Sequence, residues 1–145
     1  MKIDQFFNEY NGKYKDWDGA YGNQCVDLMR FYQRDVLNVP SQSIPPNVGA
    51  RQIFQAFLSG GNKHFAKISN SPTNAPKKGD IVFWGIYLWV TGWYGHVAIC
   101  ESADIKNILT FGQNYPTGTP CHFQKLSGLY PPYGYRGVLG WLRKR

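Results

Sequence analysis

The chain has 145 residues, enough for one domain with a sizeable core, and its hydrophobic content of 43% argues against a disordered chain. Sixteen lysines and arginines against nine acidic residues give a formal net charge of +7, and this charge, with 17% aromatic residues, favours an anionic or sugar-rich partner. No apolar run reaches the roughly 18 residues of a transmembrane helix, and the N-terminus lacks the pattern of a signal peptide.

The first 60 residues are predicted to form helices. Apolar side chains recur at helical spacing over residues 3–10, 25–37 and 49–58. A polar, glycine-rich loop over residues 11–24 joins the first two helices, and prolines within residues 40–46 break the chain before the third. Each predicted helix has an apolar face.

The pattern changes after residue 62 to short apolar runs separated by turn residues. These runs predict strands at residues 81–84, 96–100, 108–111, 121–126 and 138–142, after a loop at residues 70–76. Helices followed by strands favour an α+β fold in which the N-terminal helices pack on an antiparallel β-sheet. No repeat or linker divides the chain, so we expect a single domain over residues 1–145.

A candidate nucleophile stands where the glycine-rich loop meets the second predicted helix. The thiol of Cys25 there would be near unpaired backbone N–H groups, which predicts a lowered pKa. His96 begins a predicted strand, and Asn114 follows the next one. A cysteine on a helix with a histidine and an asparagine on strands is typical of papain-type catalysis. Taken singly, each residue is more often structural, and the odd number of cysteines shows only that at least one thiol is unpaired.

Three of the nine acidic residues lie close to Cys25 in the sequence: Asp16 and Asp18 in the loop before it, and Asp27 two residues after it. Counted from Asp16, they occupy positions 1, 3 and 12 of a loop similar to an EF-hand calcium loop. The backbone carbonyls of Ala20 and Gly22 would add ligands at positions 5 and 7. The match is partial, because position 6 is not glycine and position 12 is not glutamate. A solvated turn ahead of a helix explains the spacing equally well.

Four blocks of the sequence together resemble the CHAP family, the cysteine- and histidine-dependent amidohydrolases and peptidases. The blocks are Gly22–Leu28, Lys78–Trp84, Gly92–Ile99 and Gln113–Tyr115. The similarity is greatest to the CHAP domains of bacteriophage endolysins that attack Gram-positive cell walls. It implies a papain-like α+β fold and hydrolysis of amide bonds in peptidoglycan, with Cys25 as nucleophile and His96 as base. The bond would be that of an N-acetylmuramoyl-L-alanine amidase or of a cross-bridge endopeptidase.

The resemblance also bears on the third catalytic residue and on the metal. Endolysin CHAP domains often have a glutamate two residues before the asparagine, whereas this chain has Gly112. Orientation of the imidazole is then expected from Asn114, a neutral partner that stabilises imidazolium less than a carboxylate does. Some endolysin CHAP domains hold calcium in the stretch that matches Asp16, Asp18 and Asp27, so the resemblance favours a structural calcium ion here.

Aromatic residues crowd the segment before His96 and recur in residues 130–135. They would either line a substrate groove or pack on the core. The aromatic residues before His96 are Trp84, Tyr87, Trp89, Trp93 and Tyr94. The alternatives to a peptidoglycan hydrolase are a non-catalytic basic and aromatic module that binds cell walls or nucleic acid, and a cytosolic thiol acyltransferase. No nucleic-acid recognition motif is present.

The expected partner is bacterial peptidoglycan, with no nucleic acid and no membrane insertion, and the expected state is a monomer. Because no signal peptide is found, we expect synthesis in the host cytoplasm and action on the cell wall after release.

Overall fold

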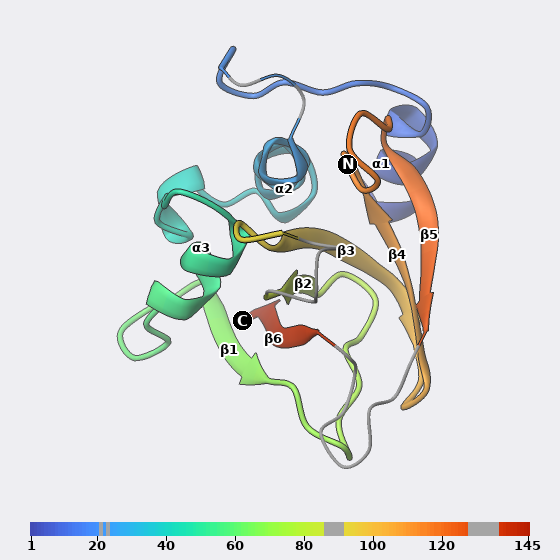
Figure 1. Ribbon diagram of the computed structural model, residues 1–145. Helices are drawn as coiled ribbons and strands as arrows, with labels where there is room; N and C mark the ends of the chain where they lie inside the picture. Colours follow the sequence, from blue (N-terminus) through green and yellow to red (C-terminus); the bar gives the residue numbers. More distant parts are fainter. Residues whose placement is uncertain (21, 23, 86–91, 128–136) are drawn as a thin grey trace.

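The computed structural model describes residues 1–20, 22, 24–85, 92–127 and 137–145. In these residues helices precede strands along the chain (Figure 1). The helical elements are α1 (Ile3–Tyr10), α2 (Cys25–Tyr32), the π-helix η1 (Gln33–Leu37), the 3₁₀-helix η2 (Ser41–Ser43) and α3 (Ala50–Ala56). The strands are β1 (Phe65–Ser69), β2 (Ile81–Trp84), β3 (His96–Ala103), β4 (Asn107–Gly112), β5 (His122–Ser127) and β6 (Val138–Lys144). The α+β prediction is confirmed.

The helices follow the predicted apolar spacing, with shorter α-helical segments. The predicted helix over residues 25–37 divides into α2 and η1, and η1 ends where Asn38 takes a left-handed conformation with φ 52°. The predicted helix over residues 49–58 shortens to α3, because Phe57 turns to extended backbone and buries its ring while Leu58 is exposed. None of the helices in the described part of the chain has the length and apolar character needed to cross a membrane.

The strands form one antiparallel sheet in the order β1-β6-β2-β3-β4-β5. The five predicted strands are present as β2 to β6, and β3 continues past residue 100 to Ala103 through an irregularity in its pairing with β4. β1 was not predicted. It lies at the sheet edge, pairs with β6, and fully buries Phe65 alone of its five residues, so its sequence lacks a clear strand pattern.

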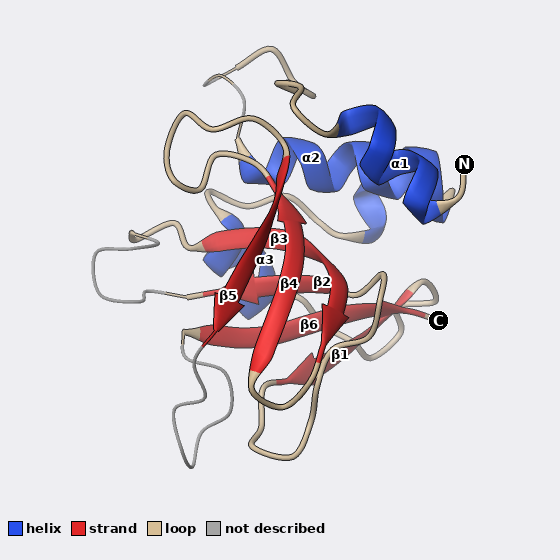
Figure 2. Cartoon of the chain, turned by 90° about the vertical axis from the view of Figure 1, so that its right-hand side faces the viewer, coloured by secondary structure: helices blue, strands red, loops and turns tan. Residues whose placement is uncertain are grey.

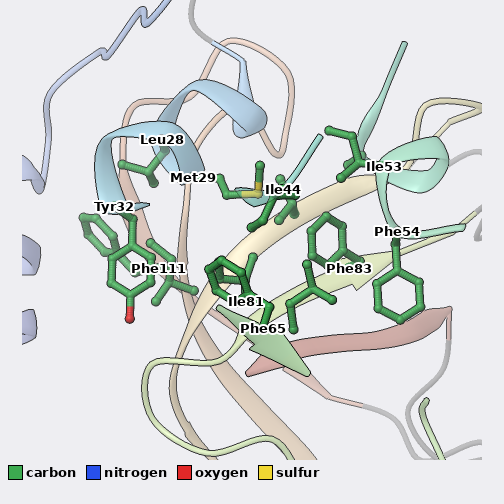
Figure 3. Packing of buried hydrophobic residues seen from close by; sticks show 14 of the residues in the cluster. Leu28, Met29, Tyr32, Ile44, Ile53, Phe54, Phe65, Ile81, Phe83 and Phe111 are labelled. Carbon is green, nitrogen blue, oxygen red and sulfur yellow. The ribbon is translucent and has the colours of Figure 1, made fainter. Parts of the chain in front are cut away.

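The sheet curves (Figure 2). Buried apolar side chains form one cluster on each of its faces. On one face α2 contacts β3, and α3 contacts β2, β3 and β6. The main core lies between these layers (Figure 3), and its labelled members are Leu28, Met29, Tyr32, Ile44, Ile53, Phe54, Phe65, Ile81, Phe83 and Phe111. Val82 and Trp84 alternate with Ile81 and Phe83 along β2 and belong to a second cluster. β2 is therefore buried on both faces.

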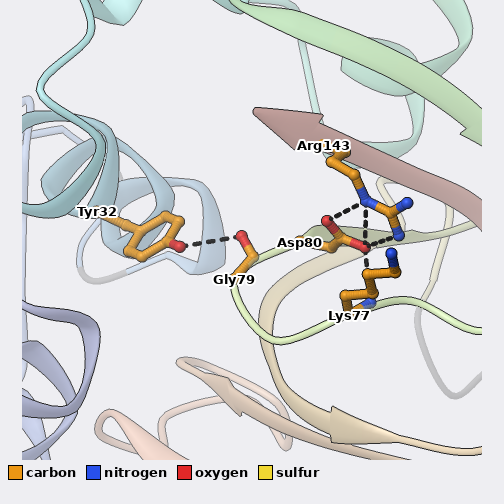
Figure 4. A network of polar contacts seen from close by, with 5 residues as sticks. All are labelled: Tyr32, Lys77, Gly79, Asp80 and Arg143. Atoms are coloured by element: carbon orange, nitrogen blue, oxygen red, sulfur yellow. Dashed lines mark hydrogen bonds and ion pairs between the residues drawn. The ribbon is translucent and has the colours of Figure 1, made fainter. Parts of the chain in front are cut away.

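A polar network fastens the start of β2 to its neighbours (Figure 4). Arg143 on β6 forms an ion pair with the buried carboxylate of Asp80 at 2.6 Å, and the N–H of Lys77 donates to the same carboxylate at 2.7 Å. The hydroxyl of Tyr32 on α2 donates to the carbonyl of Gly79 at 2.9 Å. These contacts hold the turn before β2 between the end of β6 and α2.

Candidate active site

Cys25 is the first residue of α2, and the local sequence sets that start. Gln24 has extended backbone, with φ −96° and ψ 163°, and so precedes the helix. Its N–H donates to Asp27 Oδ2 at 2.9 Å, and its carbonyl accepts from the Asp27 N–H at 3.1 Å. These reciprocal bonds satisfy polar groups that a helix start leaves open. The partly buried thiol of Cys25 is thereby held at the N-terminal end of α2.

The thiol of Cys25 meets β3 at the residue that follows His96. Burial raises the pKa of Cys25 to about 11, although the backbone N–H groups of Val97 and Val26 act on the sulfur in the opposite direction. The lowered pKa predicted from the helix start is therefore wrong. Cys25 packs against the main core, and its removal from water outweighs the N–H groups around it. The candidate nucleophile therefore lies against β3, beside the backbone of Val97.

His96 opens β3 and is 4% exposed. Burial lowers its pKa to about 3, and the electrostatic interaction with His122 acts in the same direction. The imidazole is therefore neutral at pH 7, which is the form that accepts a proton in general base catalysis. Its ring contacts those of Trp84 and Tyr115, with centroid distances of 5.4 Å and 5.0 Å. Two aromatic neighbours thus restrict the orientation of the imidazole.

Two glycines near His96 allow close approaches of the backbone that a side chain would block. Gly95 has φ 71°, and a Cβ there would lie 2.2 Å from the carbonyl oxygen of Trp84. A Cβ at Gly112 would lie 3.0 Å from the Cβ of Ala98 and 3.4 Å from His96 Nε2. The Nε2 edge of the imidazole therefore faces the backbone of β4 at the position where the sequence lacks a glutamate.

Asn114 follows β4 in a left-handed conformation with φ 65°. Its Oδ1 accepts from the N–H of Gly118 at 2.7 Å, and its N–H donates to the carbonyl of Thr119 at 3.0 Å. These bonds close a turn over residues 114–119. The side-chain acceptor is thus engaged within its own loop, and orientation of His96 by Asn114 stays a prediction.

Two residues beside Asn114 contribute contacts that the sequence did not predict. Tyr115 supplies one of the rings against His96. Gln113 is fully buried. Its side-chain amide forms hydrogen bonds with the backbone of Lys15 and Gln24, the residues at the two ends of the acidic loop (residues 16–24). Both residues lie in the Gln113–Tyr115 block that resembles the CHAP family, but the sequence does not show which residues their side chains contact.

The structure brings the three predicted acidic residues together. One carboxylate oxygen from each of Asp16, Asp18 and Asp27 lies within 4.8 Å of the other two. Burial raises the pKa of Asp27 to about 6, and repulsion from Asp18 and Asp16 acts in the same direction. Ala20 and Gly22 are exposed in the same loop. The cluster is concentrated negative charge in a basic protein, a donor set that suits a hard cation.

Exposed aromatic rings stand on the turn before His96. Trp93 and Tyr94 are 56% and 59% exposed, and Arg51 holds the turn by donating from Nε to the Trp93 carbonyl at 2.8 Å and by stacking on the Trp93 ring. Trp84 is buried and belongs to the core. The remaining predicted aromatics lie outside the described residues: Tyr87, Trp89 and residues 130–135. Of the predicted groove aromatics that are described, Trp93 and Tyr94 are available to a substrate.

A protein-family model and the sequence of a phage protein both match most of this chain. The family described as CHAP domain matches residues 14–114. The chain is 27% identical over 132 residues to the endolysin PlyTW of Staphylococcus phage Twort, an alignment that covers 88% of this chain and 26% of that protein. The chain therefore spans about a quarter of this relative's length.

Solved structures share the fold. The endolysin LysIME-EF1 matches with a TM-score of 0.66 and 24% identity, covering 99% of this chain and 64% of that one. Ly7917, solved with the hydrolysing product of MDP, matches with a TM-score of 0.64 and 20% identity, covering 96% of this chain and 60% of that one. The chain spans less than two thirds of either structure.

Proposed function

The chain belongs to the CHAP domain family, and from this premise we propose that it hydrolyses an amide bond of Gram-positive peptidoglycan, with Cys25 as nucleophile and His96 as general base. The observation that carries the proposal is the contact between α2 and β3, where the Cys25 thiol lies by the backbone N–H of the residue after a buried, neutral histidine. The likeness to endolysin PlyTW, along most of this chain, supports the choice of substrate.

The chemistry would be acyl transfer through a thioester. Both groups are neutral at rest, so the proton of the Cys25 thiol passes to His96 as the sulfur attacks the amide carbon. The imidazolium then protonates the leaving amine, and His96 next activates the water that hydrolyses the thioester. The Cys25 backbone N–H, at the helix start, is a candidate donor to the oxyanion.

The acidic cluster would hold a calcium ion in the active protein. Carboxylate oxygens are hard ligands, and the raised pKa of Asp27 shows that its negative charge is unfavourable without a nearby cation. Asp16, Asp18 and Asp27 fit such an ion, with the backbone carbonyls of Ala20 and Gly22 as further candidate ligands. When bound, the ion would neutralise these carboxylates and stabilise the loop that leads to Cys25.

The partner we propose is peptidoglycan, reached after release from the host cell in which the protein is made. A non-catalytic wall-binding or nucleic-acid-binding module is the weaker alternative, because it assigns no role to a thiol on α2 that lies beside the residue following a neutral imidazole on β3. An acyltransferase would use the same two residues, and it is distinguished by its products.

The products of digestion test the proposal. Purified Gram-positive cell walls treated with the protein are expected to release new amino groups without new reducing sugars, because an amide rather than a glycosidic bond is cut. Mass spectrometry then separates the two candidate bonds: sugar-free stem peptides indicate the amidase, and severed cross-bridges indicate the endopeptidase. New reducing ends, or wall association without soluble products, would contradict the proposed hydrolysis.

A further inference from the structure

We propose that Gln113 is a positioning residue that places the nucleophile by holding both sides of the acidic loop, residues 16–24. The inference rests on the proposed function in so far as it takes Cys25 as the nucleophile. Gln113 itself touches none of the proposed reacting atoms. It acts through the backbone on which Cys25 is carried.

The evidence is a set of hydrogen bonds from one buried amide. Gln113 is 0% exposed. Its Oε1 accepts from the Lys15 N–H at 2.7 Å, and its Nε2 donates to the Lys15 carbonyl at 2.8 Å. The same Nε2 donates to the Gln24 carbonyl at 2.9 Å. The Cys121 thiol donates to Oε1 at 3.2 Å, so both ends of the amide are engaged.

The two backbone partners are the residues that bound the loop. Lys15 immediately precedes Asp16, and Gln24 immediately precedes Cys25. The Gln24 carbonyl also accepts from the Asp27 N–H, so it is the first acceptor of α2. Fixing this carbonyl fixes the position from which α2 departs. Any displacement of Gln24 is passed to Cys25 through a single peptide bond.

The amide also joins this loop to the strand beside the base. Gln113 directly follows Gly112, whose backbone lies against the imidazole of His96. Backbone bonds between Cys121 and residues 12 and 13, each 2.8 Å long, fasten the chain ahead of the loop. Gln113 holds the other end of the loop through its hydrogen bond to the Gln24 carbonyl. One side chain therefore relates the start of α2 to the end of β4, and with it Cys25 to His96.

A test compares two fully buried glutamines. Gln113→Met keeps approximate size and shape but removes every hydrogen bond to Lys15 and Gln24. Gln33→Met is the matched control, because Gln33 is also 0% exposed and donates to the carbonyls of Pro40 and Ser41, which lie outside the proposed site. Both changes remove several hydrogen bonds made by a buried amide and should lower the melting temperature similarly. Each variant is assayed well below its own melting temperature, with excess calcium.

The expected result is a loss of kcat confined to Gln113. Gln113→Met should lower kcat on soluble peptidoglycan fragments at least tenfold with KM changed less than twofold, while Gln33→Met keeps kcat within twofold of wild type. Gln113→Asn, one methylene shorter, should fall between Gln113→Met and wild type, and it carries the comparison if Gln113→Met does not fold.

Two outcomes would overturn the proposal. One is wild-type kcat in folded Gln113→Met, or in Gln113→Asn where that variant is used. The other is an equal loss of kcat in the Gln33 control, which would show that the loss of kcat reflects lower overall stability. Cys25→Ser, run alongside, separates this failure from that of the proposed function. If Cys25→Ser is inactive while the Gln113 variants turn over normally, only the positioning role is rejected.

Discussion

At the scale of single residues, the pKa values of Cys25 and His96 move apart. Burial raises the first to about 11 and lowers the second to about 3, so the resting site contains a thiol and a neutral imidazole. Reasoning from the helix start alone predicts a thiolate, because the sequence shows the N–H groups but not the core against which the sulfur packs. Proton transfer is therefore part of the proposed attack rather than a step completed beforehand.

The buried histidine predicts a pH-dependent stability. An unfolded chain takes up a proton at His96 near pH 6.5, whereas the folded chain does so only near pH 3. This contribution to stability is present above pH 6.5 and is lost as the pH falls toward 3. Between pH 7 and pH 5 the loss should be about 2 kcal/mol.

Urea unfolding at both pH values checks this, with calcium held constant. The wild type should lose about 2 kcal/mol more than His96→Gln between pH 7 and pH 5. His64→Gln, outside the core, should keep the wild-type dependence. Parallel curves for the wild type and His96→Gln would show that His96 does not titrate differently in the folded state.

At the scale of elements, the acidic loop and α2 act as one unit. Asp27 lies on α2, Asp16 and Asp18 lie on the loop, and their oxygens converge. An ion bound to the folded chain at a hundredfold excess over its Kd would add about 2.7 kcal/mol to the free energy of unfolding. For a chain of this size, that corresponds to a rise in melting temperature of roughly 5 °C or more.

Calorimetry with calcium or with a chelator measures this directly. Calcium should raise the melting temperature of the wild type, and Asp18→Asn should abolish the rise. Glu9→Gln, which removes an exposed carboxylate from α1, should leave the response to calcium unchanged. Identical melting temperatures in calcium and chelator would favour a solvated turn over a metal site.

The junction of β2 and β6 predicts a contrast between buried and exposed ion pairs. Asp80→Ala leaves Arg143 and the Lys77 N–H without their shared acceptor, and should cost roughly 3 kcal/mol. Lys78→Ala breaks exposed pairs to Asp4 and Glu101, and should cost much less, because solvent screens both pairs. Equal losses in denaturant unfolding would mean that Asp80 does not hold the turn before β2.

At the scale of the whole molecule, the order of helices and strands was sufficient to predict the α+β fold. Apolar runs located β2, β3, β4 and β6 because each includes several buried hydrophobic residues, and β5 follows the buried Cys121, whereas β1 depends on its pairing with β6 at the sheet edge. The acidic residues were predicted from their spacing, and Cys25, His96 and Asn114 from their places at a helix start and at strand ends together with the CHAP resemblance. The Gln113 contacts were not, because they join residues 98 and 89 positions apart along the chain.

We propose that this basic domain hydrolyses peptidoglycan through one thiol, that of Cys25. The most direct measurement is clearing of a Gram-positive cell-wall suspension by the wild type, Cys25→Ser and Cys100→Ser, all confirmed as folded. Cys100 is a fully buried cysteine on β3 and serves as the control. We expect Cys25→Ser to lower the clearing rate roughly a thousandfold or more, while Cys100→Ser clears at a rate close to wild type. Clearing by folded Cys25→Ser at the wild-type rate would contradict the role of Cys25 as nucleophile.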